Sequence, residues 1–208
     1  TYDGVRLSDR DFLELLSAVR DAKVLPMVHT ENDHAVAFLT RRLLAQGLVE
    51  PKYHAASRPA LVEAEAANRV AVLAGLVDAP LYIAHLTCAE TLGYVRLARQ
   101  RGQRVYAETC PQYLLLSDED YDRPGFEGAK YVLSPPLRRK DNWDVLWAAL
   151  QEDALQVVST DHCPWDYATQ KALGRNGFNA IPNGAPGIET RIPLLSSEGV
   201  VKGRLSLE

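Results

Sequence analysis

The stretch Val157-Val158-Ser159-Thr160-Asp161 joins a short apolar run to a carboxylate, and the same pattern occurs twice earlier in the chain. Residues 24–28 lead to His29, and residues 81–84 lead to His85. A short apolar run between helical segments is typical of a buried strand of a parallel sheet. Each of these three strands is therefore predicted to end on a side chain that can bind a metal ion.

Segments with helical spacing alternate with these apolar runs. Phe12, Leu15, Leu16 and Val19, for example, recur at the intervals of an amphipathic helix. The full pattern predicts helices over 9–23, 32–45, 59–77, 89–101 and 141–152, strands over 24–29, 81–85, 104–108 and 155–160, and a loop over 168–187. This alternation indicates an α/β fold with a parallel sheet covered by helices.

The predicted strands number about half of those in a (β/α)₈ barrel, which needs roughly 250 residues. The chain has 208 residues, and a half barrel would expose two sheet edges. The fold is therefore either an open sheet or a part of a barrel. Because the first residue is Thr1 and not Met, we expect the chain to begin within a longer gene.

Composition narrows the functional classes. Hydrophobic residues make up 47% and charged residues 24%, which is ordinary for a globular protein and excludes disorder as the main state. With a net charge of −4, the chain has no general attraction for nucleic acid or for an anionic membrane, and its apolar runs are too short to cross a bilayer. Cys88, Cys110 and Cys163 form no CxxC pair, which argues against a zinc ribbon and favours reduced thiols in the cytoplasm.

Three candidate ligands follow the strands. The carboxyl ends of parallel strands share one edge, so His29, His85 and Asp161 are predicted to converge although they lie far apart in the sequence. Neutral imidazole and carboxylate suit zinc and similar divalent ions, and a metal-activated water attacks carbonyl groups. One histidine at a strand end is more often a hydrogen-bonded structural residue, so the interpretation rests on all three. The residues alone indicate a metal hydrolase of an amide-like bond.

Several motifs of the chain resemble those of the dihydropyrimidinase and D-hydantoinase family of cyclic amidohydrolases. They follow the family's order along nearly the whole chain: His29-Thr30-Glu31-Asn32, the segment 54–69, Ile83-Ala84-His85-Leu86, and the strings CPQYL at 110–114, SPPLR at 134–138, STDHCP at 159–164 and IPNG at 181–184. The resemblance implies a (β/α)₈ barrel with two divalent metal ions, usually zinc. It also implies hydrolysis of a dihydropyrimidine or 5-substituted hydantoin to an N-carbamoyl amino acid.

The resemblance also implies roles for the metal ligands. His29 and His85 match the two histidines that hold the more exposed metal, and Asp161 matches the aspartate that binds the buried metal and moves the proton. The family's HxH pair is absent from the chain, and its carboxylated lysine is expected just upstream of Thr1. We therefore expect residues 1–208 to be one partial barrel domain, the second half of the barrel of a longer enzyme, without the C-terminal β-sandwich part. Alone, this chain is expected to be inactive and poorly soluble.

Substrate contacts are implied in the same way. Tyr2 matches the tyrosine whose hydroxyl steadies the oxyanion of the tetrahedral intermediate. Ser134 and Asn183 match positions whose backbone groups bind the edge of a cyclic ureide or imide. The resemblance further implies a cytoplasmic homotetramer that acts in pyrimidine degradation on a small cyclic substrate.

Two alternatives stay open. Allantoinase and dihydroorotase share the metal site but bind different substrate edges, so a substrate panel would separate them. Relatives similar to the collapsin response mediator proteins keep the fold, lose the metal and act as adaptors. Retention of His29, His85 and Asp161 argues against the adaptor alternative.

Other polar residues are interpreted as structural. His54 is expected to lie in a loop and to position the following helix. His162 is expected to point away from its neighbour Asp161, since adjacent residues of a strand alternate in direction. The charged run 138–141 is expected to be solvated, although Arg138 lies beside the expected substrate loop.

Overall fold

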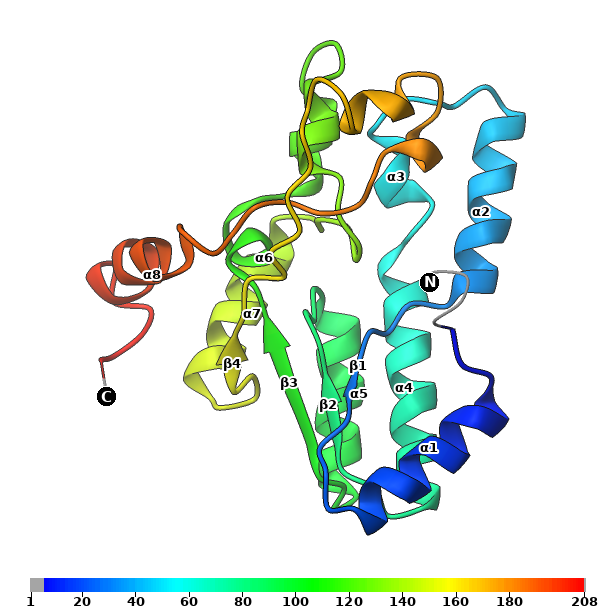
Figure 1. The fold of residues 1–208 in the computed structure, drawn as a ribbon. Helices are drawn as coiled ribbons and strands as arrows, with labels where there is room; N and C mark the ends of the chain where they lie inside the picture. Colours follow the sequence, from blue (N-terminus) through cyan, green and yellow to red (C-terminus); the bar gives the residue numbers. More distant parts are fainter. Residues whose placement is uncertain (1–5, 208) are drawn as a thin grey trace.

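The computed structural model describes residues 6–207, and the strands of this part form one parallel sheet in the order β1-β2-β3-β4. β1 (Met27–Val28) pairs with β2 (Leu81–Ile83), β2 with β3 (Val105–Thr109), and β3 with β4 (Val157–Val158). Helices lie between successive strands in the chain (Figure 1). The α/β architecture predicted from the alternation of helices and strands is therefore confirmed.

The longer helices begin and end close to their predicted bounds. In chain order, the α-helices are α1 (Asp9–Asp21), α2 (Asp33–Ala45), α3 (Tyr53–Ala56), α4 (Ala60–Leu76), α5 (Ala89–Gln100), α6 (Pro111–Leu115), α7 (Asp141–Gln151) and α8 (Arg191–Leu194). The shorter turns are the 3₁₀ helices η1 (Asp118–Asp122), η2 (Glu127–Tyr131), η3 (Lys171–Gly174) and η4 (Phe178–Ala180) and the π-helical η5 (Leu195–Val201). The predicted loop over 168–187 thus contains η3 and η4. No helix in residues 6–207 is long and apolar enough to cross a membrane.

β1, β2 and β4 are shorter than predicted, whereas β3 keeps its predicted length of five residues, and β1 shows why the others shorten. Its hydrogen bonds to β2 come from the carbonyl oxygens of Pro26 and Val28, which accept from the amides of Tyr82 and Ala84. Val24 precedes these bonds and is exposed, so the apolar character of the run extends beyond the paired residues. Hydrophobicity alone therefore overestimates the length of this edge strand.

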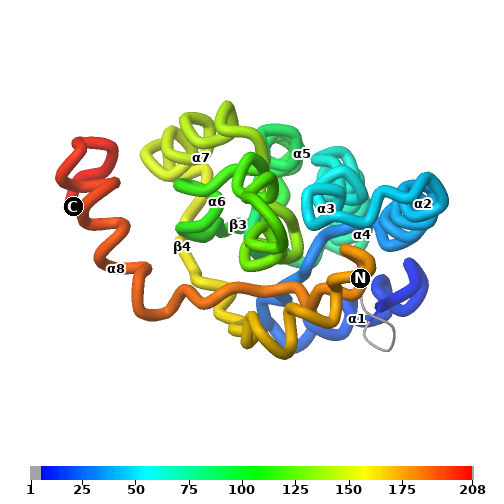
Figure 2. The backbone as a smooth tube through the Cα atoms, turned by 90° about the horizontal axis from the view of Figure 1, so that it is seen from above, coloured from blue at the N-terminus to red at the C-terminus, as the bar shows by residue number. Residues whose placement is uncertain are grey.

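The two faces of the sheet differ because successive side chains of a strand point to opposite sides. On one face, Leu81, Ile83 and Ala107 are each at most 1% exposed and belong to the main core. On the other face, Met27 and Tyr106 are 65% and 42% exposed. Figure 2 shows α4, α5 and α7 along one side of the strands, and we name that side the covered face and the opposite side the bare face.

The segments that follow the strands gather above their carboxyl ends. The segment 168–187 crosses above this end of the sheet (Figure 1), where its η4 contacts α3 and its η3 contacts η2. Near the C-terminus, the chain packs against α7, since Gly199 lies close to Trp147 and the guanidinium of Arg204 lies 5.3 Å from the Trp147 ring centroid. Among residues 6–207, the expected ligands His29, His85 and Asp161 each follow a strand, and the expected substrate residues Ser134 and Asn183 lie in the loops.

Candidate metal centre

Two histidines lie in contact at the carboxyl ends of β1 and β2. Nδ1 of His29 is 3.0 Å from Nε2 of His85, and the two rings meet at 72°. A tetrahedral zinc ion bound to two imidazole nitrogens at 2.0–2.1 Å would hold those nitrogens about 3.3 Å apart. The facing nitrogens of His29 and His85 therefore have close to the separation that a shared metal ion requires.

His85 is held in an unusual backbone conformation. Its φ of 37° lies in the left-handed region, and its backbone N–H donates to Oε1 of Glu108 at 3.3 Å. Burial, and then the neighbouring His29, lower the pKa of His85. The ring is thus neutral at neutral pH, which is the form that binds metal ions. Its Nδ1 is buried and has no hydrogen-bond partner within residues 6–207.

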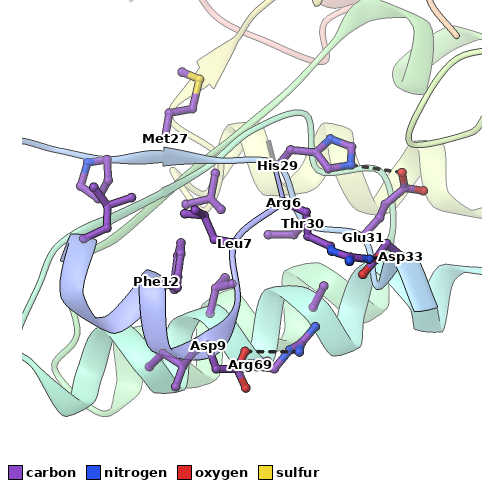
Figure 3. A pocket seen from close by; sticks show the side chains of 16 residues that line it. Arg6, Leu7, Asp9, Phe12, Met27, His29, Thr30, Glu31, Asp33 and Arg69 are labelled. Carbon is purple, nitrogen blue, oxygen red and sulfur yellow. Dashed lines mark hydrogen bonds and ion pairs between the residues drawn. The ribbon is translucent and has the colours of Figure 1, made fainter. Parts of the chain in front are cut away.

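His29 is oriented by a buried carboxylate. Oε2 of Glu31 lies 3.1 Å from Nε2 of His29 and 2.7 Å from Nη1 of Arg58. Figure 3 marks the contact between His29 and Glu31 with a dashed line. Burial opposes the charge of Glu31, but Arg58, His29 and the Ser134 hydroxyl outweigh it and hold the pKa of Glu31 well below its usual range. Ionised Glu31 accepts the Nε2 proton of His29, so the lone pair of Nδ1 faces His85.

The segment that carries His29 and Glu31 is short because a helix begins directly after it. Asn32 caps α2, and its Oδ1 accepts a hydrogen bond from the backbone N–H of Ala35 at 3.0 Å. The amide of Asn32 also donates to Glu65 on α4. The strand end and the helix start therefore fix both ends of the His29–Glu31 segment.

Asp161 follows β4 and lines the same cavity as His29 and His85, an open hollow of about 610 Å³. Its φ of 46° is also left-handed, and its carboxylate acts electrostatically on His85. Within residues 6–207, no three His, Cys, Asp or Glu side chains lie close enough together to hold one ion. The structure thus gathers the three predicted residues in one cavity and brings two of them into contact, while their role as ligands stays a prediction.

Glu108 is a further carboxylate of this cavity and was not among the site residues predicted from the sequence. It is buried at the end of β3, and its carboxylate accepts hydrogen bonds from the hydroxyls of Tyr82 at 2.6 Å and Ser159 at 2.7 Å, besides the amide of His85. It therefore ties together the ends of β2, β3 and β4. The sequence pattern that points to Asp161 also points to Glu108, since Glu108 lies at the end of the predicted strand 104–108.

The expected substrate residues lie beside this cavity. The hydroxyl of Ser134 donates to Glu31 and accepts from Nη1 of Arg58 at 3.2 Å. Asn183 and Arg58 line a neighbouring cavity of about 340 Å³. The backbone carbonyl of Asn183 accepts from the indole N–H of Trp165 at 2.8 Å. Tyr2 lies outside the described residues.

Three structural expectations need correction. His54 belongs to α3, where its buried Nε2 donates to the carbonyl of Leu133. His162 lies beyond the end of β4 at Val158, so strand alternation does not apply to it; it lines the same cavity as Asp161, and its Nδ1 accepts from the backbone amides of Gly187 and Ile188. Arg138 is buried, since it pairs with Glu63 of α4 at 2.9 Å and donates to the Thr87 hydroxyl.

Comparisons with known proteins place this geometry among hydantoinases, although no family model matches the chain. The chain is 48% identical over 207 residues to a D-hydantoinase of Ralstonia pickettii and 44% identical over 205 residues to a D-hydantoinase of Geobacillus stearothermophilus. These matches cover 99% of the chain but only 45% and 44% of the two relatives. The chain thus spans less than half the length of the curated relatives that it matches.

Solved structures give the same result. A dihydropyrimidinase from Brevibacillus agri superposes with a TM-score of 0.97 at 47% identity, covering 100% of this chain and 45% of the other. An L-hydantoinase (dihydropyrimidinase) from Arthrobacter aurescens superposes with a TM-score of 0.90 at 28% identity, covering 100% of this chain and 46% of the other. The described residues therefore have a partial barrel fold of the (β/α)₈ type.

Proposed function

The chain belongs to the D-hydantoinase and dihydropyrimidinase family, and from this premise we propose that the complete protein is a metal-dependent cyclic amidohydrolase. Its substrates are 5-substituted hydantoins or dihydropyrimidines, and its products are N-carbamoyl amino acids. The observation that carries the proposal is the 3.0 Å contact between Nδ1 of His29 and Nε2 of His85, in one cavity with Asp161.

Two divalent ions, most suitably zinc, would be held at this cavity. His29 and His85 would hold the first ion through their facing nitrogens, and Asp161 would contribute to the second. The remaining ligands, including a carboxylated lysine, would come from chain upstream of Thr1. When bound, such ions lower the pKa of a water ligand and polarise a substrate carbonyl.

The side chains of the chain would then transfer the proton, orient a metal ligand and stabilise the oxyanion. Asp161 would accept the proton of the attacking water and pass it to the ring nitrogen, so that the C–N bond breaks and the ring opens to a carboxylate and a ureido or amide nitrogen. Glu31 keeps the Nδ1 lone pair of His29 directed toward His85. The Tyr2 hydroxyl would donate to the oxyanion, at the point where negative charge develops.

Substrate binding would use backbone groups. A cyclic ureide or imide presents alternating donors and acceptors along one edge, which backbone N–H and C=O groups of Ser134 and Asn183 can match. The complete protein is proposed to be a cytoplasmic homotetramer that binds this small substrate and does not bind nucleic acid or membranes. The net charge of −4 over residues 1–208 supports the absence of nucleic-acid and membrane binding, because both of those partners are anionic.

The test is turnover by the protein made from its complete reading frame, with zinc added. We expect hydrolysis of hydantoin and dihydrouracil and much slower hydrolysis of allantoin and dihydroorotate. His85→Asn should lower kcat/KM by about 10³-fold, because one ligand of the ion is lost. His34→Asn on α2 is the matched control and should keep wild-type turnover. Wild-type turnover by the His85→Asn variant would refute the proposal, and preference for allantoin or dihydroorotate would indicate a sister activity.

The 208-residue chain by itself is proposed to be inactive. Within residues 6–207 its cavity lacks a third ligand for a single ion, and several apolar side chains of the bare face are exposed. Expression of this chain alone, followed by an assay of hydantoin hydrolysis with zinc, should give no turnover and little soluble protein. Turnover comparable with that of the complete protein would contradict this expectation.

A further inference from the structure

Lys171, the first residue of η3, has a buried ammonium group outside the candidate metal centre. The side chain is 2% exposed, and its Nζ donates to three backbone carbonyls: Val132 at 2.7 Å, Pro182 at 2.7 Å and Gly184 at 2.9 Å. Three acceptors use all three N–H bonds of an ammonium ion. A buried lysine is rare, and here the partners that satisfy it are backbone carbonyls rather than a carboxylate.

These carbonyls come from two segments that are separate in the sequence. Val132 follows η2 and lies two residues before Ser134, whereas Pro182 and Gly184 flank Asn183. The two segments also meet directly, because the amide of Gly184 donates to the carbonyl of Val132 at 3.0 Å. Lys171 therefore joins the segment of Ser134 to the segment of Asn183 at the point where the two are in contact.

The segment 182–184 is confined on its other sides as well. Trp165 donates its indole N–H to the carbonyl of Asn183. Gly184 has a φ of 139°, and a Cβ at this position would lie 2.4 Å from the carbonyl oxygen of Cys163. The backbone around residue 183 is thus held by three residues. Trp165 binds the carbonyl of Asn183, Cys163 packs closely against Gly184, and Lys171 binds the carbonyls on either side.

We propose that Lys171 is a positioning residue for substrate binding, which holds the backbone groups of residues 134 and 183 at the spacing that the ring edge requires. The proposal rests on the proposed function, since those two residues are its expected ring contacts. Lys171 acts through these segments and touches neither the ions nor the reacting bond. Burial lowers the pKa of Lys171 to about 8, so the group keeps its third donor at neutral pH.

The experiment compares Lys171→Met with wild type in the protein from the complete reading frame. Lys171→Met keeps the length and apolar stem but removes all three N–H donors. We expect KM for hydantoin to rise at least about tenfold while kcat changes little and zinc content is unchanged, because loss of charged hydrogen bonds loosens the binding edge and leaves the reacting groups in place. Lys171→Gln, which keeps two N–H donors, should restore part of the affinity.

Lys52→Met is the matched control, since it removes an exposed ammonium at the N-terminal end of α3, which pairs with Glu50 and lies over the ring of Tyr53. Its KM should equal that of wild type. Amide hydrogen exchange gives a readout that does not depend on activity: the protection of residues 132–134 and 182–184 should fall in Lys171→Met and not in Lys52→Met. If wild type shows no turnover, the proposed function fails, whereas this exchange comparison still tests the anchoring role.

Three results would overturn the proposal. An unchanged KM together with unchanged exchange would show that the ammonium group does not position the two segments. A fall in kcat or in zinc content at constant KM would place the effect of Lys171 at the metal centre. Failure of both Lys171→Met and Lys171→Gln to fold, judged by thermal melting, would make Lys171 a determinant of the whole fold and not of the binding edge.

Discussion

The covered face and the bare face of the sheet are built from the same strands, yet they differ in what packs on them. Ile83 and Ala107 point into a core closed by α4, α5 and α7, whereas their neighbours Tyr82 and Tyr106 point to the opposite side. The bare face is not polar, since Met27, Tyr106 and Val157 are all exposed. An exposed apolar sheet face normally marks a surface that another element covers.

This difference between the two faces indicates which of them residues 6–207 can pack without further chain. The covered face holds its core with residues 6–207 alone, while the bare face presents apolar side chains around the polar residues Glu108 and Ser159. We propose that in the complete protein this face lines the interior of the barrel. The candidate metal centre lies at the carboxyl end of that interior. Its chemistry therefore depends on the bare face, which residues 6–207 leave uncovered.

The largest expected effect concerns the buried ion pair on the covered side. Arg138→Met would leave the carboxylate of Glu63 buried without its cation, which costs about 3–5 kcal/mol of the free energy of unfolding. Urea denaturation measures this change. Arg139→Met, in which an exposed guanidinium is lost, should change stability by less than about 0.5 kcal/mol. Equal effects of the two variants would show that the covered side does not depend on this pair.

The second prediction tests the two faces directly. Ile83→Ala on the covered face should lower the free energy of unfolding by about 2–5 kcal/mol through the cavity it leaves. In the small soluble fraction expected of the 208-residue chain, Met27→Ala on the bare face should cost less than about 1 kcal/mol, because Met27 is largely exposed there. In the complete protein we expect the Met27→Ala cost to approach that of Ile83→Ala. A small cost in both proteins would argue against an interior position for the bare face.

The third prediction concerns pH and the loops above both faces. Burial, and then Arg58, lower the pKa of His54 to about 3, so the folded protein keeps this ring neutral while the unfolded chain takes up a proton below about pH 6.5. The stability that this contributes is complete above pH 6.5 and is lost as the pH falls toward 3, by up to about 1.4 kcal/mol per pH unit.

Urea denaturation between pH 7 and pH 5 measures this slope. From pH 7 to pH 5, wild type should lose about 2 kcal/mol more than His54→Gln, which cannot take up the proton. The control variant His34→Gln should follow wild type. Parallel pH profiles for wild type and His54→Gln would show that His54 is not the buried neutral group described by its hydrogen bond to Leu133.

The fold was largely predictable because its helices follow a strong local pattern. The bounds of α4, α5 and α7 agree with the sequence to within about one residue, since Pro59 opens α4, Gly102 follows α5, and Asp141 begins α7. The strands were predicted in place. β1, β2 and β4 were predicted too long, because apolar residues such as Val24 continue past the paired positions, whereas β3 differs by one residue at each end. The short α3, α6 and η turns have no such periodicity and depend on tertiary contacts, as the buried bond from His54 to Leu133 illustrates.

The site was predictable in position and less so in detail. Strand ends placed His29, His85 and Asp161 in one cavity, because topology alone brings such residues together. The orientation of His29 by Glu31, and the joining of strands by Glu108, require partners distant in the sequence. Lys171 gives no sequence signal either, since its three acceptors are backbone carbonyls that any residue could supply.

The most direct test of the central claim is the zinc content of the complete protein, measured by elemental analysis for wild type and His85→Asn after dialysis. We expect about two zinc ions per wild-type chain and at most about one per variant chain, because the ion between His29 and His85 loses a ligand. Circular dichroism must show the same fold in both proteins. An equally folded His85→Asn variant that keeps the wild-type zinc content would contradict the claim that these two histidines share a metal ion.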